Sequence, residues 1–383
     1  AQGIIEKRPE DGYEEFYYSH HPYPDGPEPE DYARWLQEEK GVNINRLYPD
    51  TQKAYGPGVP EEFHQTTWAG ARALEFIENN KDKSWMLNIN LFDPHPPFDP
   101  PEEFLHHYQE KDIPLPFFQE SDISSQKQFE KLDQQVKTAK NILEMDQKNM
   151  ELRQNTEGPT HSSAPSSYNP RKIKACYYAS IELIDKYTGI IMDKLEQLDL
   201  LQDTIIIFMS DHGELLGDHG LLYKGCRFYE GLVHVPLIIS GQGRFKENVK
   251  SKALVELIDI APTLLDAAGI ETPYWIQGKS LYPLLTGKKT PDHHKSQVIA
   301  EYNDALNLPE ASHGFMCFDG KYKIAVYQDL KIGEIYDLEN DPEEFNNLWT
   351  DPEYEELKQK LLKKLINSMM KSESAGIKRT GDY

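Results

Sequence analysis

Cysteine, long apolar runs and glycosylation signals are scarce or absent in this sequence of 383 residues. Its three cysteines, Cys176, Cys226 and Cys317, do not form a readable disulfide framework. No apolar run reaches 18 residues, so no membrane span is predicted. The sequence has no N-x-S/T sequon, which favours a bacterial source. It shows no signal peptide, and the compartment stays open between periplasm, extracellular space and cytoplasm. It begins without Met, so we expect its natural start to lie upstream.

Positive charge is also in deficit. The 41 Lys and Arg are outnumbered by 64 Asp and Glu, giving a formal net charge of −23. This balance argues against nonspecific binding of nucleic acid, which requires a basic surface. It does not exclude an anionic ligand, because a divalent metal and a few local cations reverse the field within one pocket. The length predicts one large and one small domain.

The most informative pattern is an apolar run that ends in charged residues. Residues 205–209 are β-branched or apolar and predict a buried strand, which Ser210, Asp211 and His212 follow directly. Ligands of open α/β sheets bind beyond the carboxyl ends of strands, and adjacent Asp and His side chains suit a metal site with oxygen and nitrogen ligands. The tripeptide alone fits a helix N-cap and turn equally well.

Two further residues have the chemistry to bind an anion. Lys224 follows thirteen residues after Asp211, in a glycine-rich polar loop, and a lysine there suits an anionic group held on a metal. His95 follows a second predicted strand, 85–92, and its proline neighbours keep it out of a helix. A histidine held in this way is suited to acid catalysis or to anion binding. The alternative is a histidine in a proline-rich surface loop.

Taken together, these motifs resemble the sulfatase family of the alkaline-phosphatase superfamily. The resemblance rests on S-D-H-G-E, G-D-H-G, K-G, Y-E-G and V-P-L-I in this order, on D-P-H-x-P-F, and on the later I-D-x-x-P-T-L-L-D and E-I-Y-D-L-E-N-D-P segments. It implies that Asp211 and His212 bind a metal ion, in this family a calcium ion. It also implies that Lys224 binds the sulfate ester, and that His95 contacts the sulfate or the leaving-group oxygen. Asp259, Pro262 and Thr263 are interpreted as a structural helix start.

One element of the family pattern is missing. Sulfatases of this family carry C/S-x-P-x-R near the N-terminus, where the Cys or Ser becomes the formylglycine nucleophile, and this sequence contains no such motif. The first pair of metal-binding Asp residues and the G-K-x-H segment are absent too. We therefore expect an N-terminal truncation, with the formylglycine encoded upstream, no turnover by the chain alone, and a central sheet that lacks partner strands.

The predicted fold is an α/β/α sandwich of the alkaline-phosphatase and sulfatase type with a smaller C-terminal antiparallel-sheet subdomain. The catalytic domain would span 1–290, with a helical insertion at about 105–170 that serves as a spacer or a lid, and the subdomain would span 291–383. Apolar spacing predicts a helix over 172–199 and an amphipathic helix on Phe129, Leu132, Val136, Ala139 and Leu143. The resemblance implies a further helix over 67–79, and the Lys/Glu-rich composition of 351–371 predicts another. Strands are predicted over 298–302, 314–319, 321–327 and 335–338, with a hairpin at Asp319-Gly320.

The function that this sequence predicts is hydrolysis of a sulfate ester, with a sugar sulfate as the best substrate class. Two alternatives stay open at this point. D-H-G-E is shared with phosphatases and phosphonate monoester hydrolases of the same superfamily, and a chain without its nucleophile could be a non-catalytic binding remnant. The oligomeric state is not readable from the sequence.

Overall fold

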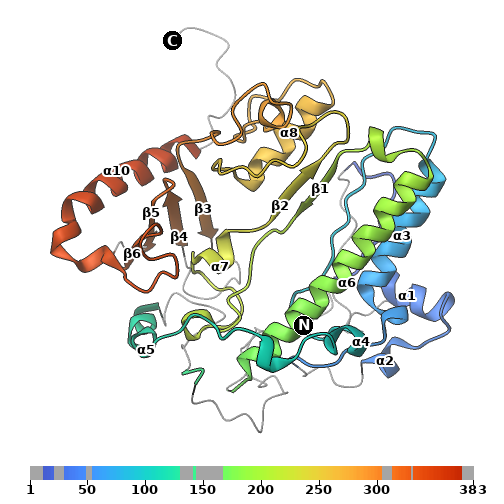
Figure 1. Cartoon of the computed structure of the whole chain (residues 1–383), viewed down its shortest axis with the longest axis horizontal. Coiled ribbons are helices and arrows are strands. Elements are labelled where there is room, and N and C mark those ends of the chain that lie inside the picture. Colours follow the sequence, from blue (N-terminus) through green and yellow to red (C-terminus); the bar gives the residue numbers. More distant parts are fainter. Residues whose placement is uncertain are drawn as a thin grey trace. The chain divides into compact units, whose positions relative to one another are not determined.

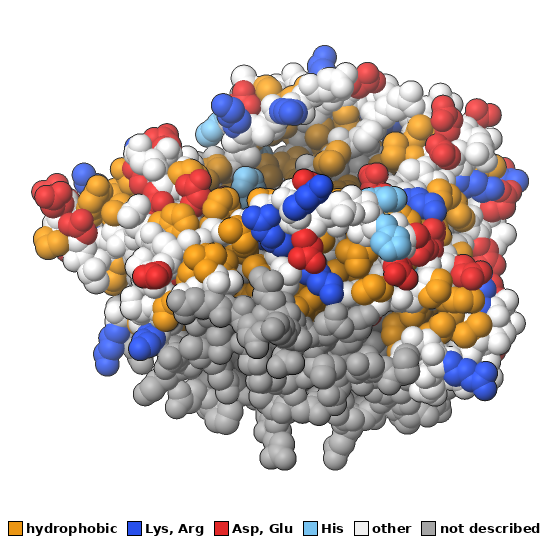
Figure 2. Space-filling view, turned by 60° about the horizontal axis from the view of Figure 1, so that its bottom comes forward, with side chains coloured by type: hydrophobic (Ala, Val, Ile, Leu, Met, Phe, Trp, Pro, Cys, Tyr) orange, Lys and Arg blue, Asp and Glu red, His pale blue; other side chains and the backbone are white. Residues whose placement is uncertain are grey.

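A computed structural model describes residues 12–20, 30–48, 54–129, 141–143, 167–303, 313–328 and 331–372. The chain forms two compact units, which are described separately. Unit 1 comprises residues 1–118, 140–202 and 216–223, and unit 2 comprises 119–139, 203–215 and 224–383. Neither unit begins at residue 291, and the expected domain boundary there stays a prediction. None of the helices in the described ranges combines the length and apolarity needed to span a bilayer. Figure 2 shows acidic and basic side chains interleaved on one face of the molecule.

Unit 1 is built on two long helices, α3 (Gln65–Asn80) and α6 (Pro170–Gln197), that lie alongside each other (Figure 1). The polar side chains of His64 and Asn169 cap their first turns, and Pro170 occupies the first turn of the second helix, where its missing N–H is tolerated. Both helices confirm the predictions for 67–79 and 172–199. The helices of this unit are α1 (Asp31–Glu38), α2 (Ile44–Leu47), α3 (Gln65–Asn80), α4 (Glu102–Leu105) and α6 (Pro170–Gln197).

The predicted strand over 85–92 is not formed. Exposure alternates residue by residue from Trp85 to Leu91, as in a strand, but none of the backbone hydrogen bonds between described residues involves this stretch. The physical reason is the lack of a partner strand among the described residues, since an extended segment becomes a β-strand only when a neighbour accepts and donates its hydrogen bonds. The period-2 pattern predicted the conformation correctly and the pairing wrongly.

Unit 2 contains two separate antiparallel sheets. In the first, β1 (Ile206–Met209) pairs with β2 (Leu237–Ser240), so that Ile206 faces Ser240 and Met209 faces Leu237. The predicted strand is therefore confirmed, but its predicted burial is wrong: Met209 is 47% exposed and Ile238 on β2 is 62% exposed. Two strands alone cannot cover their own apolar faces, and within the described residues this sheet has no third strand.

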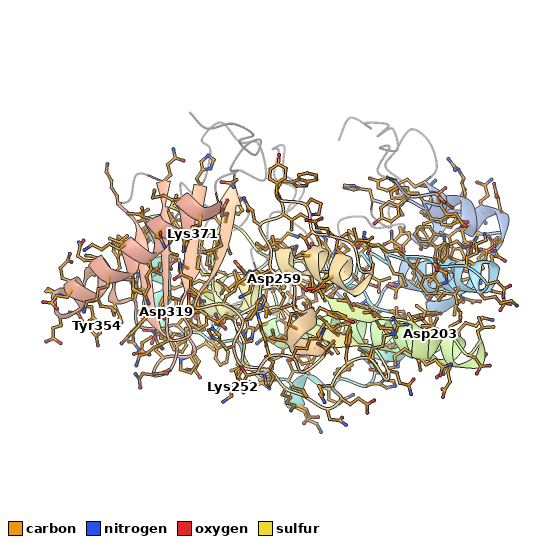
Figure 3. All side chains as sticks on the ribbon, turned by 90° about the horizontal axis from the view of Figure 1, so that it is seen from above. Asp203, Lys252, Asp259, Asp319, Tyr354 and Lys371 are labelled. Atoms are coloured by element: carbon orange, nitrogen blue, oxygen red, sulfur yellow. The ribbon has the colours of Figure 1, made fainter. Side chains whose placement is uncertain are left out.

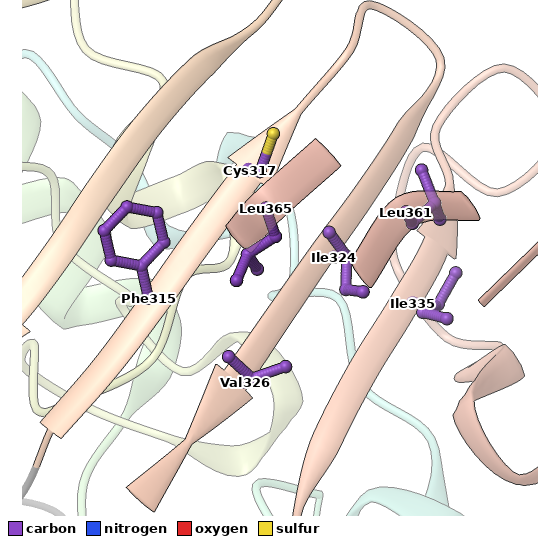
Figure 4. Packing of buried hydrophobic residues seen from close by; sticks show 7 residues of the cluster. All are labelled: Phe315, Cys317, Ile324, Val326, Ile335, Leu361 and Leu365. Atoms are coloured by element: carbon purple, nitrogen blue, oxygen red, sulfur yellow. The ribbon is translucent and has the colours of Figure 1, made fainter. Parts of the chain in front are cut away.

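The second sheet is a four-stranded meander in the order β3-β4-β5-β6, and it confirms the predicted C-terminal strands. Asp319 and Gly320 form the predicted hairpin turn, with Gly320 at φ +93°. Helix α10 (Glu355–Ser372) covers one face, as predicted, and Leu361 and Leu365 pack on Ile324 and its neighbours (Figure 4). The strands are β3 (Val298–Asn303), β4 (His313–Phe318), β5 (Tyr322–Tyr327) and β6 (Gly333–Asp337).

The remaining helices of unit 2 are short: α5 (Glu120–Gln126), α7 (Glu230–Val233), α8 (Ile260–Ala267) and α9 (Tyr282–Leu285). Asp259, labelled in Figure 3, directly precedes α8 and is fully buried. Its carboxylate accepts hydrogen bonds from the backbone N–H groups of Glu256 and Lys279. This geometry agrees with the structural role assigned to it. The amphipathic helix predicted around Leu132 and Val136 falls outside the described residues.

Candidate functional site

The loop that follows β1 is organised by its own polar groups. Ser210 Oγ donates to the carbonyl oxygen of His212 at 2.7 Å, and the Asp211 carboxylate accepts the N–H of His212 at 2.9 Å. The Asp211 side chain is 87% exposed and that of His212 is 43% exposed. Both predicted metal ligands are therefore accessible at the carboxyl end of a strand, as the sequence indicated.

Hydrogen bonding sets the tautomer of His212. Its Nδ1 lies 2.8 Å from the carbonyl oxygen of Gly213, and a carbonyl only accepts, so Nδ1 carries the proton. The basic nitrogen is then Nε2, which lies 3.8 Å from Asp211 Oδ2. A neutral imidazole oriented through its other nitrogen is the usual state of a metal-binding histidine.

The donor set around this pair was tested for its fit to a cation. One carboxylate oxygen and one basic imidazole nitrogen this close together can share an ion, and they fit part of a coordination shell. Across the described ranges, no group of three or more His, Cys, Asp or Glu side chains is gathered for metal binding. The pair therefore fits half a site, and calcium, which takes six to eight oxygen ligands, needs more donors than these two residues supply.

Gly213 holds this loop against α7. Its N–H donates to the carbonyl oxygen of Leu232 at 2.8 Å, and the N–H of Glu214 donates to that of Gly231 at 3.0 Å. A Cβ atom at position 213 would lie 1.9 Å from the Gly231 carbonyl oxygen, so only glycine permits this approach. The glycine of the D-H-G motif is thus required by backbone packing.

Lys224 lies in the electrostatic field of the same loop. Burial lowers the pKa of its half-buried amine, while the charges of Glu214 and Asp211 act in the opposite direction. The amine makes no hydrogen bond or ion pair with the described part of the chain. A cation partly removed from water and lacking a fixed partner has its hydrogen-bonding capacity available for a bound anion.

His95 belongs to unit 1, whereas the other three predicted site residues belong to unit 2. Its Nδ1 donates to the carbonyl oxygen of Pro96 at 2.7 Å, and its ring lies 4.6 Å from that of Phe92. Its predicted convergence with Lys224 on one sulfate stays a prediction.

A buried contact that the sequence did not reveal anchors the His95 loop. Thr66 Oγ1 donates to Asp93 Oδ2 at 2.5 Å, and His64 Nδ1 lies 3.5 Å from the same oxygen. Asp93 is thereby tied to the first turn of α3, two residues before His95. The polar residues at the α3 N-terminus were the available signal, because buried carboxylates are stabilised by such donors.

Comparison with known proteins identifies the family to which this chain belongs. A family model for sulfatases matches residues 6–270, and one for the C-terminal part of N-sulphoglucosamine sulphohydrolase matches 217–371. The chain therefore belongs to the sulfatase family, within the alkaline-phosphatase superfamily. Members of the sulfatase family generally use a metal ion and a formylglycine. The N-terminal truncation expected from the missing motif stays a prediction.

An individual relative supports this family assignment. An arylsulfatase of Clostridium perfringens is 28% identical over 348 residues, which are 89% of this chain and 66% of the relative. The chain thus spans slightly less than two thirds of that protein.

Solved structures confirm the α/β fold class of this family. A phosphonate monoester hydrolase from Silicibacter pomeroyi matches with a TM-score of 0.73 at 20% identity, covering 91% of this chain and 70% of that one. A structure described as a complex with its substrate D-glucosamine-2-N,6-O-disulfate matches with a TM-score of 0.64 at 21% identity, covering 83% and 72%. At these identities the likeness concerns the fold.

Proposed function

We propose that this chain forms part of a hydrolase that cleaves sulfate esters, with Asp211, His212, Lys224 and His95 in its active site. The observation that carries the proposal is the loop after β1, where an oriented Asp–His pair lies within the electrostatic reach of a half-buried lysine without a fixed partner. Membership of the sulfatase family supports the reaction type.

In this proposal Asp211 Oδ2 and His212 Nε2 contribute to the binding of a divalent cation, which we propose to be calcium. Such an ion, when bound, supplies positive charge that offsets the charge on the sulfate oxygens. These two side chains supply only part of the shell that a calcium ion takes. The nucleophile lies outside this sequence, in which no C/S-x-P-x-R motif occurs.

The remaining roles fall to the chain's own cations. Lys224 donates N–H groups to the sulfate and stabilises charge that develops during transfer, as preorganised donors do. His95, whose Nδ1 donates to the Pro96 carbonyl oxygen, holds a sulfate oxygen or donates a proton to the leaving alcohol. We propose a sugar sulfate as substrate, because a solved structural relative binds one.

The test compares the complete gene product with its Lys224→Ala variant on an aryl sulfate and an aryl phosphonate. We expect turnover of the sulfate, and a loss of about 10²-fold or more in kcat for the variant. The exposed Lys250 provides a matched control, and its alanine variant should match the unaltered protein. Faster turnover of the phosphonate would favour the related hydrolase instead, and equal rates for the two lysine variants would remove Lys224 from the site.

A further inference from the structure

A lysine buried in the four-stranded sheet has no role in the proposed chemistry. Lys323 on β5 is 2% exposed, and its Nζ lies 2.9 Å from Glu230 Oε1 and 2.5 Å from Glu344 Oε1. Desolvating an ammonium group and the Glu344 carboxylate is costly, and such groups persist only when their partners are well placed, whereas the Glu230 side chain stays 31% exposed. Hydrophobic residues of similar volume would often serve stability equally well. Lys323, Glu230 and Glu344 are called the triad below, and their contacts show what the triad holds in place.

Both carboxylates act on the start of α7. Glu230 is the first residue of this helix, and its backbone N–H donates to Glu344 Oε2 at 2.6 Å. Its side chain receives the Lys323 ammonium, so α7 is held at one residue through both its main chain and its side chain. Burial raises the pKa of Glu230, but His234 and Lys323 outweigh that effect and bring it down to about 2, which keeps the carboxylate charged.

The two residues of α7 that follow Glu230 hold the loop after β1. These residues, Gly231 and Leu232, accept the N–H groups of Glu214 and Gly213, respectively. Gly213 directly follows His212, and its contact with the Gly231 carbonyl leaves no room for even a methyl group. A continuous path of short contacts within unit 2 therefore runs from Lys323 through Glu230 and α7 to the Asp–His pair.

We infer that Lys323, with Glu230 and Glu344, is a positioning residue for Asp211 and His212: it fixes α7, and α7 fixes the backbone from which both ligands project. This inference rests on the metal-binding role proposed for the pair. The triad touches neither ligand and acts through the two backbone hydrogen bonds at Gly213 and Glu214. Its expected signature is a local loosening of that loop in an otherwise folded protein.

The experiment replaces Lys323 with Met and measures hydrogen exchange of the Gly213 and Glu214 amides. We expect exchange to accelerate by at least about tenfold, whereas the amides of β4 and β6 exchange at their original rates. Lys295→Met is the matched control, because Lys295 also bridges two carboxylates of unit 2, Glu256 and Asp259, and neither of them belongs to α7. Equal exchange in the two variants would overturn the inference. If Lys323→Met does not fold, Glu230→Gln makes the same test with a smaller change.

Calcium titration of the complete gene product gives the second readout. We expect Lys323→Met to weaken calcium binding by about 10- to 100-fold, as the loss of groups that orient metal ligands does. Asp211→Ala separates the two hypotheses. If that variant binds calcium normally, the metal site itself is wrong. If it loses calcium while Lys323→Met retains it, the metal site stands and the positioning role fails.

Discussion

The two sheets of unit 2 differ in how completely they are covered. The sheet of β3 to β6 has a helix on one face, and Ile324 at its centre is fully buried. The sheet of β1 and β2 is just as apolar in sequence, yet Ile238 is 62% exposed. The candidate site lies beyond the less covered sheet. Apolar composition alone therefore does not make a core, because burial also requires something to pack against.

The largest test of this contrast is a matched pair of substitutions. Ile324→Ala removes a fully buried side chain and should lower the free energy of unfolding by about 2–5 kcal/mol. Ile238→Ala removes a side chain that is mostly in water and should cost less than about 1 kcal/mol. Urea unfolding of both variants measures the difference. Equal costs would mean that the β1–β2 sheet is covered in solution.

A smaller effect is expected for Gly213→Ala, which tests the tie between the first sheet and α7. The new methyl group would meet the Gly231 carbonyl oxygen, so the loop must move, at a cost of about 1–3 kcal/mol. Gly189 in α6 has open space around its Cβ position, and Gly189→Ala should instead stabilise by about 0.5–1 kcal/mol. Thermal unfolding of the two variants gives the comparison. A neutral Gly213→Ala would show that the loop is not held in this way.

The smallest effect concerns an ion pair between the second sheet and α10, in which Lys364 Nζ lies 2.5 Å from Asp319 Oδ2. Burial raises the pKa of Asp319, but Lys364 and the N–H groups of Tyr322 and Lys321 outweigh it, so the net pKa is lowered. A lowered carboxyl pKa contributes stability above its ordinary value of 3.8, and that contribution is lost as the pH falls through the folded-state value. Asp319→Asn should therefore be less stable than the unaltered chain at pH 7, and the difference should vanish as the pH falls below 3.8 and through the lowered folded-state pKa of Asp319. A pH-independent difference would assign the effect to packing.

Local patterns predicted most elements correctly. The helical spacing of residues 172–199 and the Asp319-Gly320 turn are each decided by neighbouring residues, and both were found. The segment 85–92 failed for a physical reason, since its alternation specifies an extended chain but not a partner. Strand β2 was missed because four residues after a proline carry little periodicity.

In the candidate site, too, residues close together in the sequence were predicted and distant partners were not. Asp211, His212 and Lys224 were predicted together because they lie close to one another along the chain. The structure places Lys224 in the field of the Asp211 charge, and the shared role of the three residues stays a prediction. The triad of Lys323 was not found, because Glu230 lies 93 positions away. A lysine in the apolar run from 322 to 327 was the available signal, since a buried charge on a strand requires a distant partner.

The extended stretch from Trp85 to Leu91 also bears on how the protein behaves during handling. Its amides donate to no backbone acceptor among the described residues, and we expect deuterium to replace their protons much faster than those of the two long helices of unit 1. Proteases bind their substrates in this same extended form, through rows of main-chain hydrogen bonds. We therefore expect limited proteolysis to start in this stretch, close to His95, before either long helix of unit 1 is cut.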